Sequence, residues 1–361
     1  MGVNDSRQKV VTNFLANKTV YSQAPCRIDC GGTWDLTAFA LSCQWVEPLT
    51  INLALDKHIK VWLAEGRPGM VDVDSVGYVR AEERLSDLPF DGPLGLIFSI
   101  LYYFQLDGIS VKIKSEFRPQ SGLGGSGVVA VAVIAAIARL LAEVGMPRMS
   151  RTQIAILARN LEDGLLISPS GFQDQLAAAF GGANRWLWRY SNSKQPFIRQ
   201  PLWPAEEYTQ ISRHILVAFS GQTHTSAELN NTWIKGFVSG KYRKQWFDIL
   251  SAARTFGEAL ERKDWTTSMN ALRAETALRV ELTPQVLTPA MQELVQSAEE
   301  ERCAARFCGA GGGGHVWAIG GEVDIANLKL KWQKLLATFT PPGELLTAAV
   351  TKSGVLTKIL E

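Results

Sequence analysis

The alternation of apolar and polar residues predicts a sheet in the first third of the chain. Strand patterns occupy residues 19–30, 50–55, 58–63 and 108–117. A segment rich in glycine, aspartate and proline follows the third of them, which indicates antiparallel strands joined by hairpins. Residues 93–104 have the pattern of a short helix.

A longer apolar run follows this region. Residues 128–138 consist of Val, Ala and Ile alone, and the first charge after them is Arg139. A helix of this composition has no polar face, so we expect it to be buried at the centre of its domain. A second helix is expected over residues 150–162, with Ser150 as its N-cap. Three more strands are expected, at residues 185–190, 197–202 and 215–219.

The second half of the chain is mainly helical in pattern. A glycine run at residues 309–314 joins two short strand patterns, and further strands are expected over residues 345–360. We therefore predict an α+β fold in two domains. The polar linker at residues 191–194 sets the expected boundary, with one domain over residues 1–191 and the other over 192–361. The expected helices cover residues 226–237, 241–260, 266–280, 289–302 and 324–337.

Composition and charge exclude several partners. The 361 residues are 46% hydrophobic and 20% charged with a formal net charge of +2, which gives no electrostatic footprint for nucleic acid. Five cysteines, an odd count, indicate reduced thiols. The N-terminus has no apolar signal core, and the longest apolar helix is too short and glycine-led to span a bilayer. We expect a cytoplasmic protein with no membrane partner.

The segment PQSGLGGSG, directly before the apolar helix, is the strongest candidate for a binding site. Gly122, Gly124, Gly125 and Gly127 carry no Cβ atom that would keep an anion from the backbone. The uncapped N–H groups of the helix that follows point at the same space. This combination predicts a phosphate-binding loop.

Three interpretations of this loop compete. A Walker A loop requires a lysine before the Ser or Thr, and Gly125 precedes Ser126 here. Gly122, Gly124 and Gly127 match the GxGxxG dinucleotide pattern, but Glu143 lies in the same predicted helix and not after a second strand. A tight turn that caps a core helix would hardly need four glycines in six residues.

Two other segments carry candidate polar residues. In CRIDCGGTWD, Arg27 and Asp29 share one face of a strand, and Asp35 follows a glycine pair. In GFQDQLAAAFGG, Asp174 precedes a run of small residues, where packing would aim its carboxylate. The alternative interpretations are a surface ion pair for Arg27 and a helix N-terminal acid for Asp174.

Taken together, APCRIDCGGTWD, PQSGLGGSG and CGAGGGGHV resemble, in order, the three signature motifs of the GHMP kinases, the superfamily of galactokinase, homoserine kinase and mevalonate kinase. RIDCGGTWD, GFQDQLAAAFGG and FSGQTH are most similar to the branch that holds D-glycero-D-manno-heptose 7-phosphate kinase and L-fucokinase. The resemblance implies an N-terminal mixed sheet with helices and a helix-rich C-terminal domain with an antiparallel sheet. It further implies an ATP- and Mg²⁺-dependent kinase that phosphorylates the anomeric hydroxyl of heptose 7-phosphate or a fucose-like sugar.

The resemblance also implies roles for individual residues. Asp174 matches the catalytic aspartate, and Arg27 matches the arginine beside it, which would keep that carboxylate ionised. Ser126 and Glu162 would hold Mg²⁺. The ATP phosphates would be bound by Pro119, Ser121, Gly122, Leu123, Gly124, Gly125, Ser126 and Gly127. The sugar or sugar phosphate would be bound by Gly32, Trp34, Asp35, Gln173, His224, Gly311 and Gly312.

The chain departs from the motifs of the branch at four points. Gly125 replaces a serine of the phosphate loop, the order GGTWD puts the orientation of Trp34 in doubt, and His224 stands where an arginine is common. The lysine that often precedes the third motif is absent. Three bases, Arg185, Arg189 and Lys235, are candidates for binding a second phosphate on the acceptor. The sequence leaves a homodimer open.

Three alternatives to a sugar kinase stay open from the sequence. The chain could be a GHMP kinase for a non-sugar alcohol, a nucleotide-binding sensor without catalysis, or a dehydrogenase that uses the GxGxxG pattern. The sensor is disfavoured because Ser126, Glu162, Asp174 and Arg27 are all retained.

Overall fold

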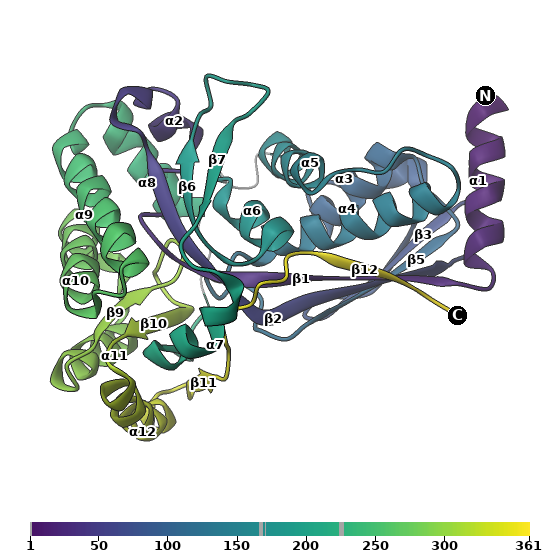
Figure 1. Ribbon diagram of the computed structural model, residues 1–361. Helices are drawn as coiled ribbons and strands as arrows, with labels where there is room; N and C mark the ends of the chain where they lie inside the picture. Colours follow the sequence, from purple (N-terminus) through teal and green to yellow (C-terminus); the bar gives the residue numbers. More distant parts are fainter. Residues whose placement is uncertain (1, 166–168, 170, 224–226) are drawn as a thin grey trace.

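The computed structural model describes residues 2–165, 169, 171–223 and 227–361. Their strands form two sheets, an eight-stranded mixed sheet and a four-stranded antiparallel sheet. Helices pack against both, and the predicted α+β class is therefore confirmed (Figure 1).

The larger sheet has the strand order β12-β1-β2-β5-β3-β4, and β6 and β7 branch from β2. The pair β3–β5 is parallel, and the other pairs described in this sheet are antiparallel. The register of β1 against β2 shifts between Pro25 and Cys26, next to the residues that reach the site. Its strands are β1 (Thr19–Cys30), β2 (Leu49–Glu65), β3 (Met70–Ser75), β4 (Ala81–Arg84), β5 (Ile109–Ser115), β6 (Ala183–Trp188), β7 (Phe197–Pro201) and β12 (Leu356–Leu360).

One strand replaces the two that were predicted over residues 50–63. β2 runs without interruption, because its first half pairs with β6 and its second half with β5. Between the two predicted segments, Asp56 binds the C-terminal part of the chain: its N–H donates to Ala349 O at 2.9 Å, and its carboxylate accepts from Ala349 N at 2.8 Å.

Helices α3 to α6 lie over one face of the larger sheet, whereas α1 stands at its far end and α2 contacts α8 (Ala227–Val238) (Figure 1). The central one is α4, which packs on β1 and β2 and begins at Gly125, at the end of the glycine loop. It is long and apolar enough to cross a membrane, but 72% of its most apolar window is buried inside the protein. The helices are α1 (Gly2–Leu15), α2 (Thr37–Ala40), α3 (Gly95–Phe104), α4 (Gly125–Glu143), α5 (Arg151–Gly164) and α6 (Gln173–Phe180).

Local sequence signals fix the ends of some helices. Ser150 caps α5 as predicted, because its hydroxyl accepts from Gln153 N at 3.2 Å and the Gln153 side chain accepts from Ser150 N at 2.8 Å. The helix α1 was not predicted from the sequence. It is held against α3 through a hydrogen bond of 2.8 Å from Arg7 to Phe104 O.

The second half places most of its helices around the smaller sheet, which has the order β11-β8-β10-β9. α9 and α10 form a packed pair, and α10 and α11 contact β9. The strands are β8 (Ile215–Phe219), β9 (Ala304–Phe307), β10 (His315–Ile319) and β11 (Glu344–Leu346). The helices are α7 (Tyr208–Ile211), α8 (Ala227–Val238), α9 (Arg243–Glu261), α10 (Trp265–Leu282), α11 (Pro289–Glu300) and α12 (Glu322–Thr338).

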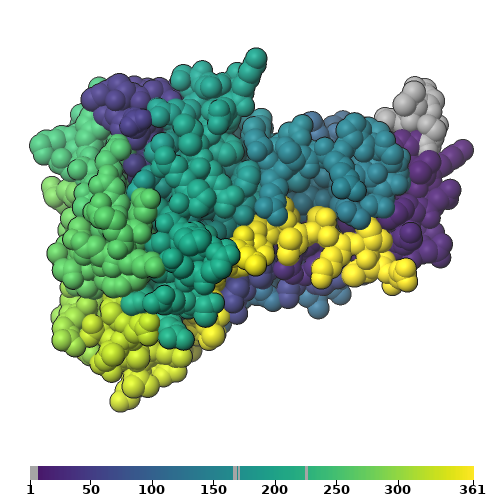
Figure 2. All heavy atoms as spheres, in the orientation of Figure 1, coloured from purple at the N-terminus to yellow at the C-terminus, as the bar shows by residue number. Residues whose placement is uncertain are grey.

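The expected boundary at residues 191/192 falls between two strands of the larger sheet. Residues 191–194 form the turn between β6 and β7, and both strands belong to the larger sheet. The chain also returns at its end, where β12 pairs with β1 and runs back along the N-terminal half (Figures 1 and 2). The C-terminal residues therefore complete the first sheet.

Candidate active site

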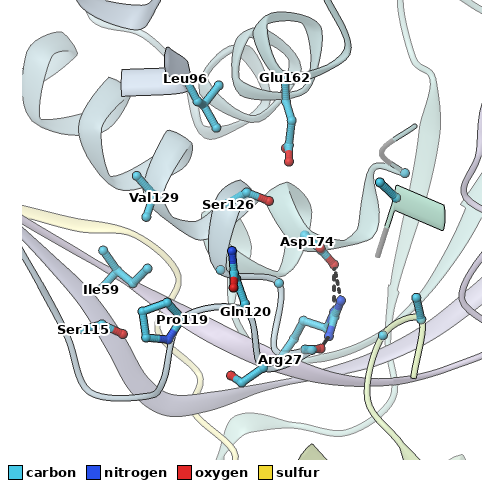
Figure 3. A pocket seen from close by; sticks show the side chains of 18 of the residues that line it. Arg27, Ile59, Leu96, Ser115, Pro119, Gln120, Ser126, Val129, Glu162 and Asp174 are labelled. Carbon is cyan, nitrogen blue, oxygen red and sulfur yellow. Dashed lines mark hydrogen bonds and ion pairs between the residues drawn. The ribbon is translucent and has the colours of Figure 1, made fainter. Parts of the chain in front are cut away.

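A cavity of about 610 Å³ lies where the glycine loop, the end of β1, the start of α6 and the start of α8 meet. Figure 3 shows that Arg27 and Asp174 face each other at one side of Ser126, while Ile59, Pro119 and Val129 lie on the other side. The cavity thus has a polar end and an apolar end. It is lined by Arg27, Asp35, Pro119, Ser121, Gly122, Gly124, Gly125, Ser126, Glu162, Gln173 and Asp174 among the residues predicted for the site.

The closest charged pair in the cavity is Arg27 with Asp174. Nε of Arg27 donates to Oδ1 of Asp174 at 2.8 Å, and one of its terminal nitrogens lies 2.7 Å from the same oxygen. Burial alone would lower the pKa of Arg27, but Asp174 and Asp29 hold it above its ordinary value. The carboxylate of Asp174 remains 27% exposed toward the cavity, so it is oriented by the arginine and open to a ligand.

The glycines of the loop let Asp174 approach the backbone. A Cβ on Gly124 would lie 2.9 Å from the Asp174 carboxyl carbon, and a Cβ on Gly127 would lie 2.9 Å from its Cβ. Gly122 and Gly124 also have φ angles of 83° and 81°, which other residues rarely adopt. The glycines thus place the carboxylate beside the N-terminus of α4, in addition to leaving room for an anion.

The N-terminus of α4 is uncapped by any side chain. Gly124 is the N-cap residue, so the N–H groups of Gly125, Ser126 and Gly127 have no acceptor within the helix. These donors carry the positive end of the helix dipole and face a cavity that Gly125 and Ser126 line. The arrangement can bind a phosphate group.

Asp35 is held at the start of α6. Its Oδ2 accepts from the N–H groups of Phe172 at 2.8 Å and Gln173 at 3.1 Å. Gly171 permits this approach, because a Cβ there would lie 1.6 Å from the same oxygen. Burial, and secondarily the charge of Asp174, raises the pKa of Asp35 to about 6. Asp35 thus positions the helix that carries Asp174 and still lines the cavity.

The side chains of Glu162 and Ser126 lie above Asp174 (Figure 3). Glu162 is buried, and it accepts from Gln175 Nε2 at 2.7 Å. Burial raises its pKa to about 7, although hydrogen bonds with Ser126 and Gln175 oppose the shift, and no described cation pairs with it. A buried carboxylate beside a hydroxyl, with phosphate-binding donors nearby, suits Mg²⁺, which takes one or two protein carboxylates plus substrate phosphates.

The third glycine segment closes the cavity from the second half of the chain. Gly309 N donates to Oδ1 of Asp29 at 2.8 Å, and His315 N donates to Ser121 O at 2.9 Å. Gly314 passes so close to Ser121 that a Cβ would lie 2.4 Å from its carbonyl oxygen. These contacts join the segment to β1 and to the phosphate loop.

Sequence reasoning missed a buried cluster of charges behind the site. Arg306 lies 2.7 Å from Glu275 and 3.3 Å from Asp29, and Arg279 lies 3.0 Å from Glu275. Arg279 also donates to Thr33 Oγ1 at 2.9 Å and to the carbonyl of Gly32, so it fixes the turn before Asp35. Burial alone would raise the pKa of Glu275, but the two arginines lower it to about 2.

Several predicted residues lie away from the cavity. Trp34 is fully buried, packs on Phe39, Phe237 and Phe247, and donates to Trp246 O at 3.1 Å. Contrary to expectation, it belongs to the hydrophobic core.

The remaining predicted residues act behind the cavity lining or lie beyond the described chain. Gly32, Leu123 and Gly127 support the loops, and Leu123 O accepts from Arg27 N at 3.3 Å. In the third motif, Gly309 and Ala310 line the cavity, whereas Gly311 and Gly312 pack against Val286. His224 lies outside the described residues.

Comparisons with known proteins found two matching family models and several relatives. The family model "GHMP kinases N terminal domain" matches residues 95–182, and "GHMP kinases C terminal" matches residues 258–338. The chain is 26% identical to D-glycero-alpha-D-manno-heptose 7-phosphate kinase of Campylobacter jejuni over 353 residues, which cover 94% of this chain and 98% of that one.

Two further relatives extend the comparison. L-fucokinase/L-fucose-1-P guanylyltransferase of Bacteroides fragilis is 20% identical over 94% of this chain, which spans 38% of that longer protein. The structure of Lactococcus lactis galactokinase in complex with galactose superposes with a TM-score of 0.72 at 14% identity, over 98% of this chain and 99% of that chain. The chain therefore belongs to the GHMP kinases and has their two-domain fold.

Proposed function

We propose that the protein is an ATP- and Mg²⁺-dependent kinase that phosphorylates the anomeric hydroxyl of a sugar, of the heptose 7-phosphate or fucose type. The observation that carries the proposal is the Arg27–Asp174 pair, which lies against the phosphate loop at the polar end of the cavity. The names of the Campylobacter jejuni and Bacteroides fragilis relatives support the choice of acceptor.

The apolar end of the cavity suits the base of the nucleotide. Ile59, Leu96, Ile97 and Val129 line it, and Phe117 lies at the start of the phosphate loop. An adenine ring would be bound there largely by apolar contact, with the phosphates directed toward the N-terminus of α4. The γ-phosphate would then lie near Asp174.

The reaction places a hydroxyl of the acceptor beside Asp174. The hydroxyl oxygen forms a bond to the γ-phosphorus, and the bond between this phosphorus and the β,γ-bridging oxygen breaks, which releases ADP. The proton of the hydroxyl passes to the Asp174 carboxylate and from there to solvent. Because the transition state is loose, the carboxylate contributes mainly by orienting the hydroxyl, and Arg27 holds it in place.

Glu162 and Ser126 would hold Mg²⁺. Bound there, the metal would supply charge stabilisation to the β- and γ-phosphates. The N–H groups of Gly125, Ser126 and Gly127 would donate to the same phosphates, and they are already fixed by α4 before the nucleotide binds.

The proposal is tested by coupled ADP release with MgATP and a panel of sugars. Asp174→Asn should lower kcat by roughly 10²–10⁴-fold, the range for a positioned acid–base group. Asp248→Asn is the matched control, because Asp248 forms only an exposed pair with Lys244 at 2.8 Å. Full sugar-dependent ADP release by Asp174→Asn would contradict the assigned chemistry, and nucleotide binding without turnover on any acceptor would favour a sensor.

A further inference from the structure

The polar end of the cavity, where the acceptor would bind, is built from three segments. Thr33 and Asp35 come from the turn after β1, Gly171 precedes α6, and Asn230 and Trp233 come from α8. Hydrogen bonds connect these segments to one another and to the core. Trp233 donates its indole N–H to Thr283 at 2.9 Å.

Among the described residues at this end, the buried polar atom that lacks a partner is a hydrogen-bond acceptor. Oε1 of Gln173 is buried and has no hydrogen-bond partner among the described residues, and Gln173 lines the cavity. The carboxylates of Asp35 and Asp174 face the same space. Sugar hydroxyls can donate to such groups, whereas a phosphate ester that is fully ionised can only accept.

Cations available for a phosphate on the acceptor are scarce. Every lysine and arginine of the chain lies within the described residues, and of these Arg27 and Arg118 line the cavity. Arg27 is already paired with Asp174 and lies 3.5 Å from Asp29. Arg118 pairs with Glu344 at 2.9 Å and packs over the ring of Phe219, so it lies beside the smaller sheet.

The three bases considered from the sequence do not reach the cavity. Arg185 pairs with Glu261 at 3.1 Å, Arg189 pairs with Glu47 at 2.7 Å, and Lys235 is exposed outside the cavity lining. The residues outside the described part of the chain contain one titratable base, His224, and no lysine or arginine. The N-terminus of α8, near Ala227, does not offer a free positive charge to a phosphate either, because Glu228 in its first turn already complements the helix dipole.

We propose that the acceptor is a sugar that carries no phosphate group. Its hydroxyls would donate to Gln173, Asp35 and Asp174, and Trp233 would provide an apolar wall for its ring. A second phosphate would instead meet carboxylates with no free arginine or lysine to neutralise it. The inference rests on the proposed sugar kinase activity and separates this chain from the heptose 7-phosphate kinase that it resembles.

The test compares matched pairs of acceptors in the coupled ADP-release assay with the wild-type protein. The pairs are D-mannose with mannose 6-phosphate, D-galactose with galactose 6-phosphate, and D-glycero-D-manno-heptose with its 7-phosphate. For the sugar that is turned over, we expect kcat/KM to exceed that of its phosphate ester by about 100-fold or more, because juxtaposed like charges are strongly disfavoured.

The outcomes separate this inference from the proposed function. A phosphate ester that is used as well as or better than its free sugar overturns the inference and leaves the kinase assignment intact. No turnover of any member, with ATP binding confirmed by calorimetry, overturns the kinase assignment and with it the inference.

A gain-of-function variant tests the electrostatic reason directly. Asn230→Lys places a cation at the acceptor end and should lower KM for the phosphate ester by about tenfold, the effect of 1.4 kcal/mol. Asn231→Lys is the matched control, because Asn231 is exposed on the same helix outside the cavity lining. An equal effect of both variants, or preferential use of the ester before any substitution, would contradict the reasoning.

Discussion

Replacing Arg306 by methionine should destabilise the protein far more than the same change at an exposed arginine. Arg306 is fully buried and donates to Glu275 at 2.7 and 3.2 Å, to the Asp29 carbonyl at 3.1 Å and to its own neighbour Phe307 O at 2.7 Å. Methionine fills similar volume but leaves two buried carboxylates with fewer partners. Removal of one member of a buried charge pair costs about 3–5 kcal/mol in the free energy of unfolding.

The control for this variant is Arg302→Met. Arg302 also forms an arginine–aspartate pair, with Asp324 at 2.7 Å, but its side chain is 80% exposed. Exposed pairs contribute roughly 0–1 kcal/mol. Urea unfolding followed by circular dichroism measures both variants, and a loss at Arg306→Met no larger than at Arg302→Met would refute the energetic argument.

The same cluster predicts how the stability depends on pH. The folded-state pKa of Glu275 is about 2, below its ordinary value of 4.5, so its contribution is complete above pH 4.5 and disappears as the pH falls toward 2. Arg306→Met removes one of the two arginines that lower this pKa. The fall in stability between pH 5 and pH 3 should therefore be smaller in the variant than in the wild type, measured by the urea midpoint at each pH.

Three further predictions concern the cavity. Gly124→Ala should abolish kinase activity, because its Cβ would lie 2.9 Å from the Asp174 carboxyl carbon. Gly125→Ser should fold normally and keep more activity, because its Cβ would lie 3.8 Å from Phe117. Equal activity of the two variants in the coupled assay would contradict this. The Mg²⁺ concentration needed for half-maximal activity should rise as the pH falls below about 7, where Glu162 becomes protonated, and Glu162→Gln should remove this dependence. Trp34→Phe should lower the melting temperature without changing KM for the sugar, and a raised KM would return Trp34 to the site.

Local sequence patterns were sufficient to predict most of the helices and strands. β8 has the predicted bounds, and the apolar run after the glycine loop forms α4. These elements are specified by residues adjacent in sequence, through alternation or an unbroken apolar run. The continuity of β2 could not be read from the sequence, because it depends on pairing with β5 and β6, which come later in the chain.

The candidate site was likewise predicted only in part from the sequence. The pairing of Arg27 with Asp174, expected from the motif resemblance, is present, but Trp34 points into the core although it precedes Asp35. The turn before it contains Thr33 with a φ of 76°, and a side-chain direction after such a turn does not follow from strand periodicity.

The sequence contains a pattern that belongs to the buried charge cluster, but that pattern usually indicates an exposed ion pair. Glu275 and Arg279 are spaced four apart on a helix, the usual pattern of an exposed ion pair. Their burial follows from Arg306, Asp29 and Thr33, whose nearness depends on the packing of α10 against β9 and beside the turn after β1.

The position of the new phosphate on the product tests the central claim most directly. Wild-type protein with MgATP and the active sugar is analysed by ³¹P and ¹³C NMR, alongside Asp174→Asn at the same concentration. The account predicts a sugar 1-phosphate from the wild type and a loss of that product of roughly 10²-fold or more from the variant. Phosphate on another hydroxyl, or undiminished 1-phosphate from Asp174→Asn, would contradict the role assigned to the Arg27–Asp174 pair.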